Sequence, residues 1–227
     1  MDSLLRDPNK KAFSLTYVVY DEGDVVGMLL ALFTLLPIFA VVMYVTLIVR
    51  TRSLHTLYAF VGQMLNEGAN FLLKHFFAEK RPAGSDRDDP GMPSNHSQFV
   101  FFFCAYWIFY YTHLYRKRKG EWTARQKIEA VVGLASVFLA CTLTCVSRLY
   151  LGYHTVAQVL VGIGFGCLFG GSWFLFSQTS ITKKVLEDFA ATSVAKLFYI
   201  RNTHEVDIRG GNTQFEFDNL GRMLKRQ

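Results

Sequence analysis

Long apolar runs separated by short polar segments dominate the chain between residues 25 and 176. The first run, residues 25–49, contains no charged residue and exceeds the roughly 20 residues that cross the hydrocarbon core of a bilayer. Further runs follow at about 54–78, 97–115, 128–146 and 155–176. The pattern predicts an all-α fold, a polytopic membrane helix bundle of about five transmembrane helices. Pro37 is placed to kink the first of them.

Polar segments flank this membrane region, which we expect to form one domain over residues 25–182. Residues 1–24 lack a basic stretch leading into a short apolar core, so no cleaved signal peptide is expected. Residues 183–227 begin with the amphipathic sequence KKVLEDFAATSVAKLF and continue as a polar tail. The amphipathic part is expected to lie along the cytoplasmic surface of the membrane.

The second apolar run carries a polar stripe. Asn66, Glu67, Asn70 and Lys74 recur at steps of three and four residues, so they share one side of a helix. That side should face protein rather than lipid. For Asn66 and Asn70, a hydrogen-bond cluster between helices is as well supported as a role in a site.

The composition agrees with a membrane protein: 51% of the 227 residues are hydrophobic, and 21 are Phe. The net charge is +6, but the basic residues cluster in short stretches between apolar runs, so the expected partner is the lipid bilayer and not nucleic acid. The cysteines lie within apolar runs and show no zinc-ligand spacing, which favours buried small hydrophobic residues: Cys104, Cys141, Cys145 and Cys167.

Basic loops predict the topology. The segments RTR (50–52) and RKRKGEWTARQK (116–127) are short and basic, which places them on the cytoplasmic side. The loop at 79–95 and the hairpin at 147–154 then face the opposite side. The polar residues of these two connections are therefore expected to meet at one face of the membrane.

The ionisable residues gathered at that face are three fixed cations and two imidazoles: Lys74, Arg81, Arg148, His96 and His154. Such a set favours an anion, and a phosphate suits arginine forks and a lysine ammonium. The Asp86, Asp88 and Asp89 run is an alternative metal site, but its Asp-Arg-Asp-Asp pattern is more typical of a solvated turn. We therefore predict neither a metal nor a cofactor.

Local spacing supports a common site. Lys74 and Arg81, seven residues apart, would point the same way if the second helix continued to about Lys80. Ser94 stands at the N-cap position of the next helix, where backbone N–H groups favour an anion, and His96 falls in its first turn. His154 precedes Gln158 by four residues, which is typical of a nucleophile and the side chain that orients it.

Three motifs resemble the type 2 phosphatidic acid phosphatase superfamily, whose patterns are KxxxxxxRP, PSxH and SRxxxxxHxxxD. They stand here, in that order, as KHFFAEKRP (74–82), PSNH (93–96) and SRLYLGYHTVAQ (147–158). One position departs from the pattern, because Gln158 replaces the final aspartate. A glutamine can still accept the imidazole N–H but adds no charge.

The resemblance implies a role for each matching residue. Lys74, Arg81 and Arg148 would hold a phosphate, with Ser94 and the amides around Asn95. His154 would be the nucleophile that forms a phosphohistidine, Gln158 would orient it, and His96 would be the general acid and base. Ser147, Glu67 and Asn70 are expected to support the site.

Further stretches resemble the branch of this superfamily that hydrolyses dolichyl diphosphate, a polyprenyl diphosphate lipid: residues 15–20, 54–74, 91–99, 147–162 and 198–203. This implies recycling of the lipid carrier of N-glycosylation, with the active site on the lumenal face of the endoplasmic reticulum membrane. The alternatives are a broader lipid phosphate phosphatase acting on phosphatidate or isoprenoid phosphates, and a non-catalytic membrane protein that binds lipid phosphates. An ion pathway is disfavoured, since the charges gather at one face.

Overall fold

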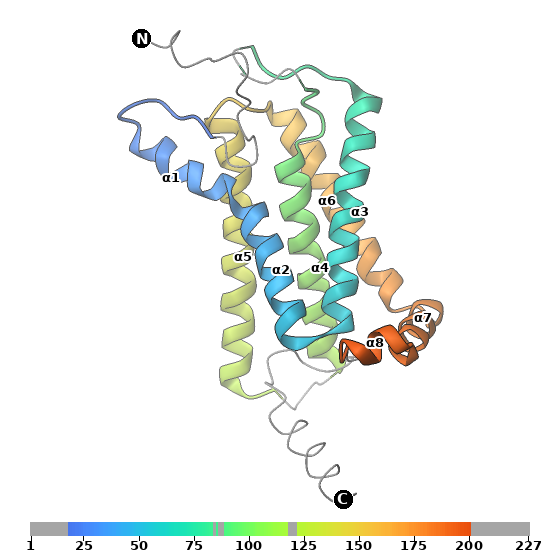
Figure 1. Ribbon diagram of the computed structural model, residues 1–227. Helices are drawn as coiled ribbons and strands as arrows, with labels where there is room; N and C mark the ends of the chain where they lie inside the picture. The colour runs from blue at the N-terminus through green and yellow to red at the C-terminus, as the bar shows by residue number, and fades with distance from the viewer. Residues whose placement is uncertain (1–17, 84, 86–88, 118–121, 201–227) are drawn as a thin grey trace, which may run out of the picture.

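The computed structural model describes residues 18–200, except residues 84, 86–88 and 118–121. Within these ranges the regular secondary structure is entirely helical (Figure 1). The helices are α1 (Val25–Thr34), α2 (Leu36–Thr51), α3 (Leu54–Phe77), α4 (Asn95–Lys117), α5 (Ala124–Tyr150), α6 (Val156–Ser177), α7 (Ser180–Ala191) and α8 (Ser193–Leu197). The predicted all-α fold is confirmed.

The first predicted span is broken in the middle, which confirms the kink expected from its proline. The helix stops at Thr34 and restarts at Leu36, with Leu35 between the two segments and Pro37 in the first turn of α2. Proline has no N–H to donate to a preceding turn, so it is tolerated at the start of a helix and not in its interior.

Three segments are long and apolar enough to cross a membrane: Val25–Thr51, Ala124–Tyr150 and Val156–Ser177. With 24 and 23 residues, α3 and α4 are also long enough, but they carry more polar side chains. Those of α3 turn inward, and Asn66 and Asn70 are buried as the polar stripe predicts. The crossing of the membrane by α3 and α4 stays a prediction.

The bundle is arranged around α4, which packs against α3, α5 and α6. The closest pair is α4 with α6, because Gly162, Gly166 and Gly170 present a side-chain-free edge to the α4 backbone. A methyl group at Gly166 would lie 2.5 Å from the carbonyl oxygen of Gln98. This close approach brings the N-terminal ends of the two helices together, where the predicted site residues lie.

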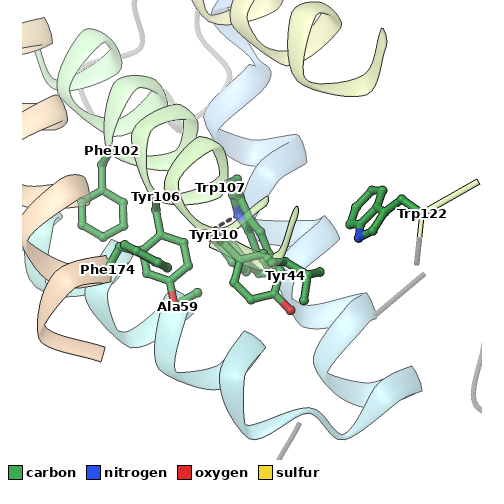
Figure 2. Packing of buried hydrophobic residues seen from close by; sticks show 9 residues of the cluster. Tyr44, Ala59, Phe102, Tyr106, Trp107, Tyr110, Trp122 and Phe174 are labelled. Atoms are coloured by element: carbon green, nitrogen blue, oxygen red, sulfur yellow. Dashed lines mark hydrogen bonds between the residues drawn. The ribbon is translucent and has the colours of Figure 1, made fainter. Parts of the chain in front are cut away.

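An aromatic core stabilises the half of the bundle away from those ends. Figure 2 shows Tyr106 of α4 beside Phe174 of α6, with ring centroids 6.0 Å apart. Trp107 donates its indole N–H to the hydroxyl of Tyr44 on α2 at 3.2 Å, so the polar tips of these rings are satisfied. The core gives α2, α3, α4 and α6 a fixed relative position.

The helix ends separate the predicted loops onto two faces. The C-terminal end of α3, the N-terminal end of α4 and the connection between α5 and α6 lie at one end of the bundle (Figure 1). The turn between α2 and α3 lies at the other end, with α7 and α8 beside it. The arrangement agrees with the topology predicted from the basic loops.

The C-terminal part matches its predicted amphipathic character as far as Ile200. Along α7, Ile181, Val185 and Phe189 are exposed and recur every four residues, while Leu186 is buried against the bundle. Such an exposed apolar stripe suits a helix that lies in the membrane interface. Residues 201–227 and 1–17 lie outside the described part of the chain.

The second predicted span, 54–78, matches α3, which ends at Phe77 because Ala78 adopts a left-handed backbone conformation (φ 47°). The helix therefore does not reach Lys80, and the condition under which Lys74 and Arg81 would point the same way along one helix is not met.

Two sequence predictions were wrong. First, α5 continues to Tyr150, so Ser147 and Arg148 lie in its last turn and the hairpin is shorter than 147–154. Second, Cys167 is exposed, whereas the other three cysteines are buried as predicted.

Candidate active site

Lys74 and Arg81 converge on a single anionic oxygen. Lys74 Nζ lies 2.7 Å and Arg81 Nη2 lies 2.8 Å from the same atom, Oδ2 of Asp89. The two cationic side chains are 14% and 5% exposed, so both are largely withdrawn from solvent. The end of α3 at Phe77 therefore does not separate them, because the following loop turns Arg81 back toward Lys74.

Asp89 is a partner of these cations and not simply part of a solvated turn, as its sequence pattern suggested. Burial would raise its pKa, but hydrogen bonds from Arg81 and Lys74, together with their charges, lower it to about 2. A carboxylate oxygen thus occupies a position where both cations meet. Asp86 and Asp88 lie outside the described residues.

Arg81 also contacts His154, which comes 73 residues later in the chain. Arg81 Nη1 lies 3.1 Å from His154 Nε2 and donates to the carbonyl oxygen of Tyr153 at 3.1 Å. A guanidinium has only donors, so Nε2 of His154 must be the unprotonated nitrogen. This nitrogen therefore accepts from the same guanidinium that binds Asp89 through Nη2.

The other imidazole nitrogen is held by Gln158, as the four-residue spacing predicts. His154 Nδ1 lies 3.1 Å from Gln158 Oε1. Because Nε2 is unprotonated, Nδ1 carries the proton and donates it to the amide oxygen. Gln158 is fully buried in the first turn of α6, where Thr155 and Gln158 form a capping box. The imidazole is thereby fixed in one orientation.

Arg148 approaches His154 from the last turn of α5. It is 2% exposed, and its Cζ atom lies 4.0 Å from the centre of the Tyr153 ring. A guanidinium over an aromatic face is stabilised by the ring quadrupole, most strongly where water is excluded. Its charge acts on His154 together with those of Arg81 and Lys74, so all three predicted cations surround this imidazole.

These surroundings keep His154 neutral. Burial first, and then the charges of Arg81 and Arg148, lower its pKa to about 3, although the hydrogen bond with Gln158 opposes the shift. A neutral imidazole with a free lone pair is a nucleophile, whereas an imidazolium is not. The site therefore combines a nucleophile with positive charge that can receive an anion.

The PSNH segment leads into α4 and is tied to α6 through the backbone of Gln158. Ser94 immediately precedes the helix, and its carbonyl oxygen accepts a hydrogen bond from Gln98 N at 3.0 Å, as expected at an N-cap position. Its own N–H donates to the carbonyl oxygen of Gln158 at 3.0 Å. Asn95 and His96 follow in the first turn of α4, and both are half-buried.

The predicted supporting residues hold neighbouring elements together. Asn70 Nδ2 donates to Gln98 Oε1 at 2.8 Å, and Gln98 Nε2 donates to Asn66 Oδ1 at 3.0 Å. The hydrogen-bond cluster expected as one interpretation of Asn66 and Asn70 is thus present, and the support of the site by Asn70 stays a prediction. Glu67 interacts with the side chain of Asn95 and with the charge of Lys74. Ser147 Oγ lies 3.1 Å from Thr34 Oγ1, which joins α5 to α1.

Sequence reasoning missed three residues of this site: Glu79, Asp89 and Tyr153. Glu79 Oε1 accepts a hydrogen bond from Gln158 Nε2 at 3.0 Å, and Tyr153 lies beneath Arg148. One signal was available for Glu79, since a glutamine in place of an aspartate brings an NH₂ group that needs an acceptor when buried. Neither Asp89 nor Tyr153 carries a comparable signal.

The described residues contain no group of three or more His, Cys, Asp or Glu side chains that could hold a metal ion. The chemistry that their arrangement can perform is nucleophilic attack on an anionic group held by Lys74, Arg81 and Arg148. A phosphoryl group fits, because its transfer depends mainly on positioning and on charge stabilisation at its oxygens.

Comparisons with known proteins agree with this chemistry. Residues 54–182 match the model of the PAP2 superfamily. The chain is 39% identical to human dolichyldiphosphatase 1 over 197 residues, which cover 84% of this chain and 81% of that protein. It is 30% identical to the dolichyldiphosphatase of Saccharomyces cerevisiae over 208 residues, 88% of this chain and 84% of the yeast protein.

A plant relative carries a different name. Lipid phosphate phosphatase gamma of Arabidopsis thaliana is 32% identical over 215 residues, which cover 92% of this chain and 90% of the plant protein. No solved structure matches the chain.

Proposed function

This chain belongs to the PAP2 superfamily, and from that premise we propose that it hydrolyses dolichyl diphosphate to dolichyl phosphate and inorganic phosphate. The observation that carries the proposal is the 3.1 Å approach of His154 Nε2 to Arg81, with Nδ1 held by Gln158. Relatives named dolichyldiphosphatase in human and yeast support the substrate. The membrane helices support a lipid that stays in the bilayer while its diphosphate reaches the interface.

The terminal phosphate would replace the Asp89 carboxylate between Lys74 and Arg81. Two of its oxygens would then receive charge-assisted hydrogen bonds from these side chains. Arg148 would contact a third, and the Ser94 hydroxyl with the amides around Asn95 would complete the cradle. Once Arg81 turns from His154 to the phosphate, the Nε2 lone pair faces phosphorus.

Hydrolysis would proceed in two steps. His154 Nε2 attacks the terminal phosphorus, the bond to the bridging oxygen breaks, and His96 protonates the departing dolichyl phosphate. The phosphohistidine is then attacked by water, whose proton passes to His96, and inorganic phosphate leaves. The three fixed cations supply the charge that a metal supplies in other phosphoryl-transfer enzymes, so no metal is required.

The location follows from the same proposal. The site lies at the end of the bundle opposite the basic turn at 50–52, which is the lumenal end if basic loops face the cytoplasm. A dolichyl diphosphatase at the lumenal face of the endoplasmic reticulum membrane would recycle the lipid carrier of N-glycosylation.

A second candidate is a phosphatase with a broader range of lipid phosphates. The Arabidopsis relative named lipid phosphate phosphatase gamma favours it. The three cations would contact the phosphate and not its lipid, so they suit phosphatidate as well. A non-catalytic role is disfavoured, because His154 and the three cations are all present and converge.

The deciding experiment measures phosphate release by the purified protein in detergent from dolichyl diphosphate and from phosphatidate, with and without EDTA. We expect faster turnover of dolichyl diphosphate, unchanged by the chelator. A His154→Gln variant should lose at least about 10³-fold in rate while keeping the elution volume of the folded protein. Preference for phosphatidate would favour the second candidate, and equal rates for His154→Gln and wild type would reject the mechanism.

A further inference from the structure

The hydrogen bonds around His154 continue beyond Gln158 to a carboxylate. Arg81 donates to His154 Nε2, and His154 Nδ1 donates to Gln158 Oε1. Gln158 Nε2 in turn donates to Glu79 Oε1 at 3.0 Å and to the carbonyl oxygen of Lys80 at 2.9 Å. In this series of hydrogen bonds every donor meets an acceptor, and the series ends at the Glu79 carboxylate.

The acceptors at Glu79 and Lys80 determine which way the Gln158 amide points. A glutamine amide can bind with its oxygen and nitrogen exchanged. In the exchanged orientation the oxygen would face a carboxylate and a carbonyl, and two contacts between acceptors would be repulsive. Glu79 therefore keeps the amide oxygen turned toward His154, which keeps the proton on Nδ1 and the lone pair on Nε2.

The position of Glu79 is itself constrained. Its carbonyl oxygen accepts a hydrogen bond from Gly91 N at 2.7 Å, which ties the segment after α3 to the segment before α4. Gly91 also packs on the amide, since a methyl group there would lie 2.6 Å from Oε1 and Nε2 of Gln158. The contact between Glu79 and Gln158 is therefore part of a closely packed arrangement.

This arrangement accounts for the glutamine at position 158. The superfamily pattern has an aspartate there, which both orients the imidazole and carries negative charge. In this chain an aspartate would face the carboxylate of Glu79, and two carboxylates in contact cannot both stay ionised at low cost. The amide instead links the imidazole to a negative charge located one residue further away.

We propose that Glu79 is a positioning residue for His154 that acts through the Gln158 amide. It fixes the orientation of the amide, and its charge stabilises the imidazole ring as the ring becomes cationic on attacking phosphorus. Glu79 does not touch the substrate, so its loss should lower kcat and leave KM nearly unchanged. This inference rests on the proposed phosphatase activity.

The test is a cycle of single and double variants at positions 79 and 158. Glu79→Ala should lower kcat about tenfold, the lower end of the effect of removing a residue that orients a catalytic group. Glu79→Gln keeps an acceptor but loses the charge, and should lower kcat about threefold. Gln158→Asp should lower kcat about tenfold or more, because the new carboxylate faces Glu79. In each variant KM should stay within twofold of wild type.

The double variant Glu79→Gln with Gln158→Asp decides between an indirect role and a merely structural one. The glutamine at 79 can donate to the new aspartate, so the double variant should be faster than Gln158→Asp alone. If Glu79 only stabilised the loop, the two losses would multiply and the double variant would be slower. A slower double variant overturns the proposal.

Glu129 provides the matched control, because it pairs with Arg125 on the surface of α5. Glu129→Gln removes the same charge and should leave kcat within twofold of wild type. The rates are measured on whichever lipid phosphate the wild type cleaves. Activity on phosphatidate alone would reject the proposed substrate and still test Glu79, whereas a wild type that cleaves no lipid phosphate would overturn both.

Discussion

Replacing Asp89 by asparagine should strengthen the binding of phosphate. In the free protein the Asp89 carboxylate occupies the position where Lys74 and Arg81 meet, at 2.7 and 2.8 Å. A phosphate must displace this carboxylate before it can bind. Asp89→Asn keeps the size of the side chain and removes the competing charge, so inorganic phosphate, the product, should inhibit the variant at lower concentration.

The size of the effect follows from the ion pairs of Asp89. The lowering of its pKa from 3.8 to about 2 corresponds to an upper limit of about 2.5 kcal/mol for its interaction with the cations. Because the Asp89 side chain is 47% exposed, solvent screening reduces this to about 1 kcal/mol. Removing a competitor of that strength should lower the inhibition constant of phosphate about fivefold.

The assay measures inhibition of turnover by inorganic phosphate in the wild type, Asp89→Asn and Asp21→Asn. Asp21 is an exposed residue before α1, so its variant removes one charge without disturbing the cations. We expect a fivefold change for Asp89→Asn and less than a twofold change for Asp21→Asn. Weaker inhibition of Asp89→Asn than of wild type would refute the reasoning, because it would mean that Asp89 orders the cations and does not compete for them.

Three further predictions concern the pH dependence of stability, the packing of α6 on α4, and the contact of Arg148 with Tyr153. The pKa of His154 is about 3 in the folded protein and about 6.5 when unfolded, so between these pH values only the unfolded state binds the extra proton. The free energy of unfolding should therefore decrease as pH falls below 6.5, by about 2 kcal/mol at pH 5. Thermal unfolding measured over this pH range should show a smaller decrease for His154→Gln. Gly166→Ala should cost about 2 kcal/mol of stability, since the added methyl meets the α4 backbone, whereas Gly164→Ala, with open space around it, should cost none in the same thermal unfolding assay. Tyr153→Leu removes the ring beneath Arg148 and should raise KM about tenfold, while Tyr153→Phe keeps the ring and should stay within threefold in the same kinetic assay.

Much of the site could be predicted from the sequence, because the motifs place each residue at a helix end and the basic loops place those ends on one face. Lys74 on α3 lies close enough to His154 before α6 for its charge to act on the imidazole, and Ser94 before α4 donates its N–H to the carbonyl oxygen of Gln158. Gln158 contacts His154 although Thr155 between them is extended (ψ 162°), because the capping box turns the Gln158 side chain back toward the N-terminal end of α6, where His154 lies.

The remaining features depend on contacts between distant segments. Glu79 and Gln158 are 79 residues apart, and only the folded structure shows that the glutamate accepts a hydrogen bond from the Gln158 amide and is not a solvated charge. Arg148 was expected in a loop because a charge usually ends an apolar helix. Its burial against Tyr153 instead allows α5 to continue past it. Sequence patterns report the chemistry of a residue but not the partner that stabilises it.

The central claim, that His154 attacks phosphorus, is tested most directly by trapping the phosphorylated protein. Dolichyl diphosphate labelled at its terminal phosphate is mixed with the protein and quenched in alkaline detergent, in which phosphohistidine survives. We predict label on the peptide that contains His154, and no label in His154→Gln. Rapid turnover without any labelled protein, or label that persists in His154→Gln, would contradict a covalent intermediate at this residue.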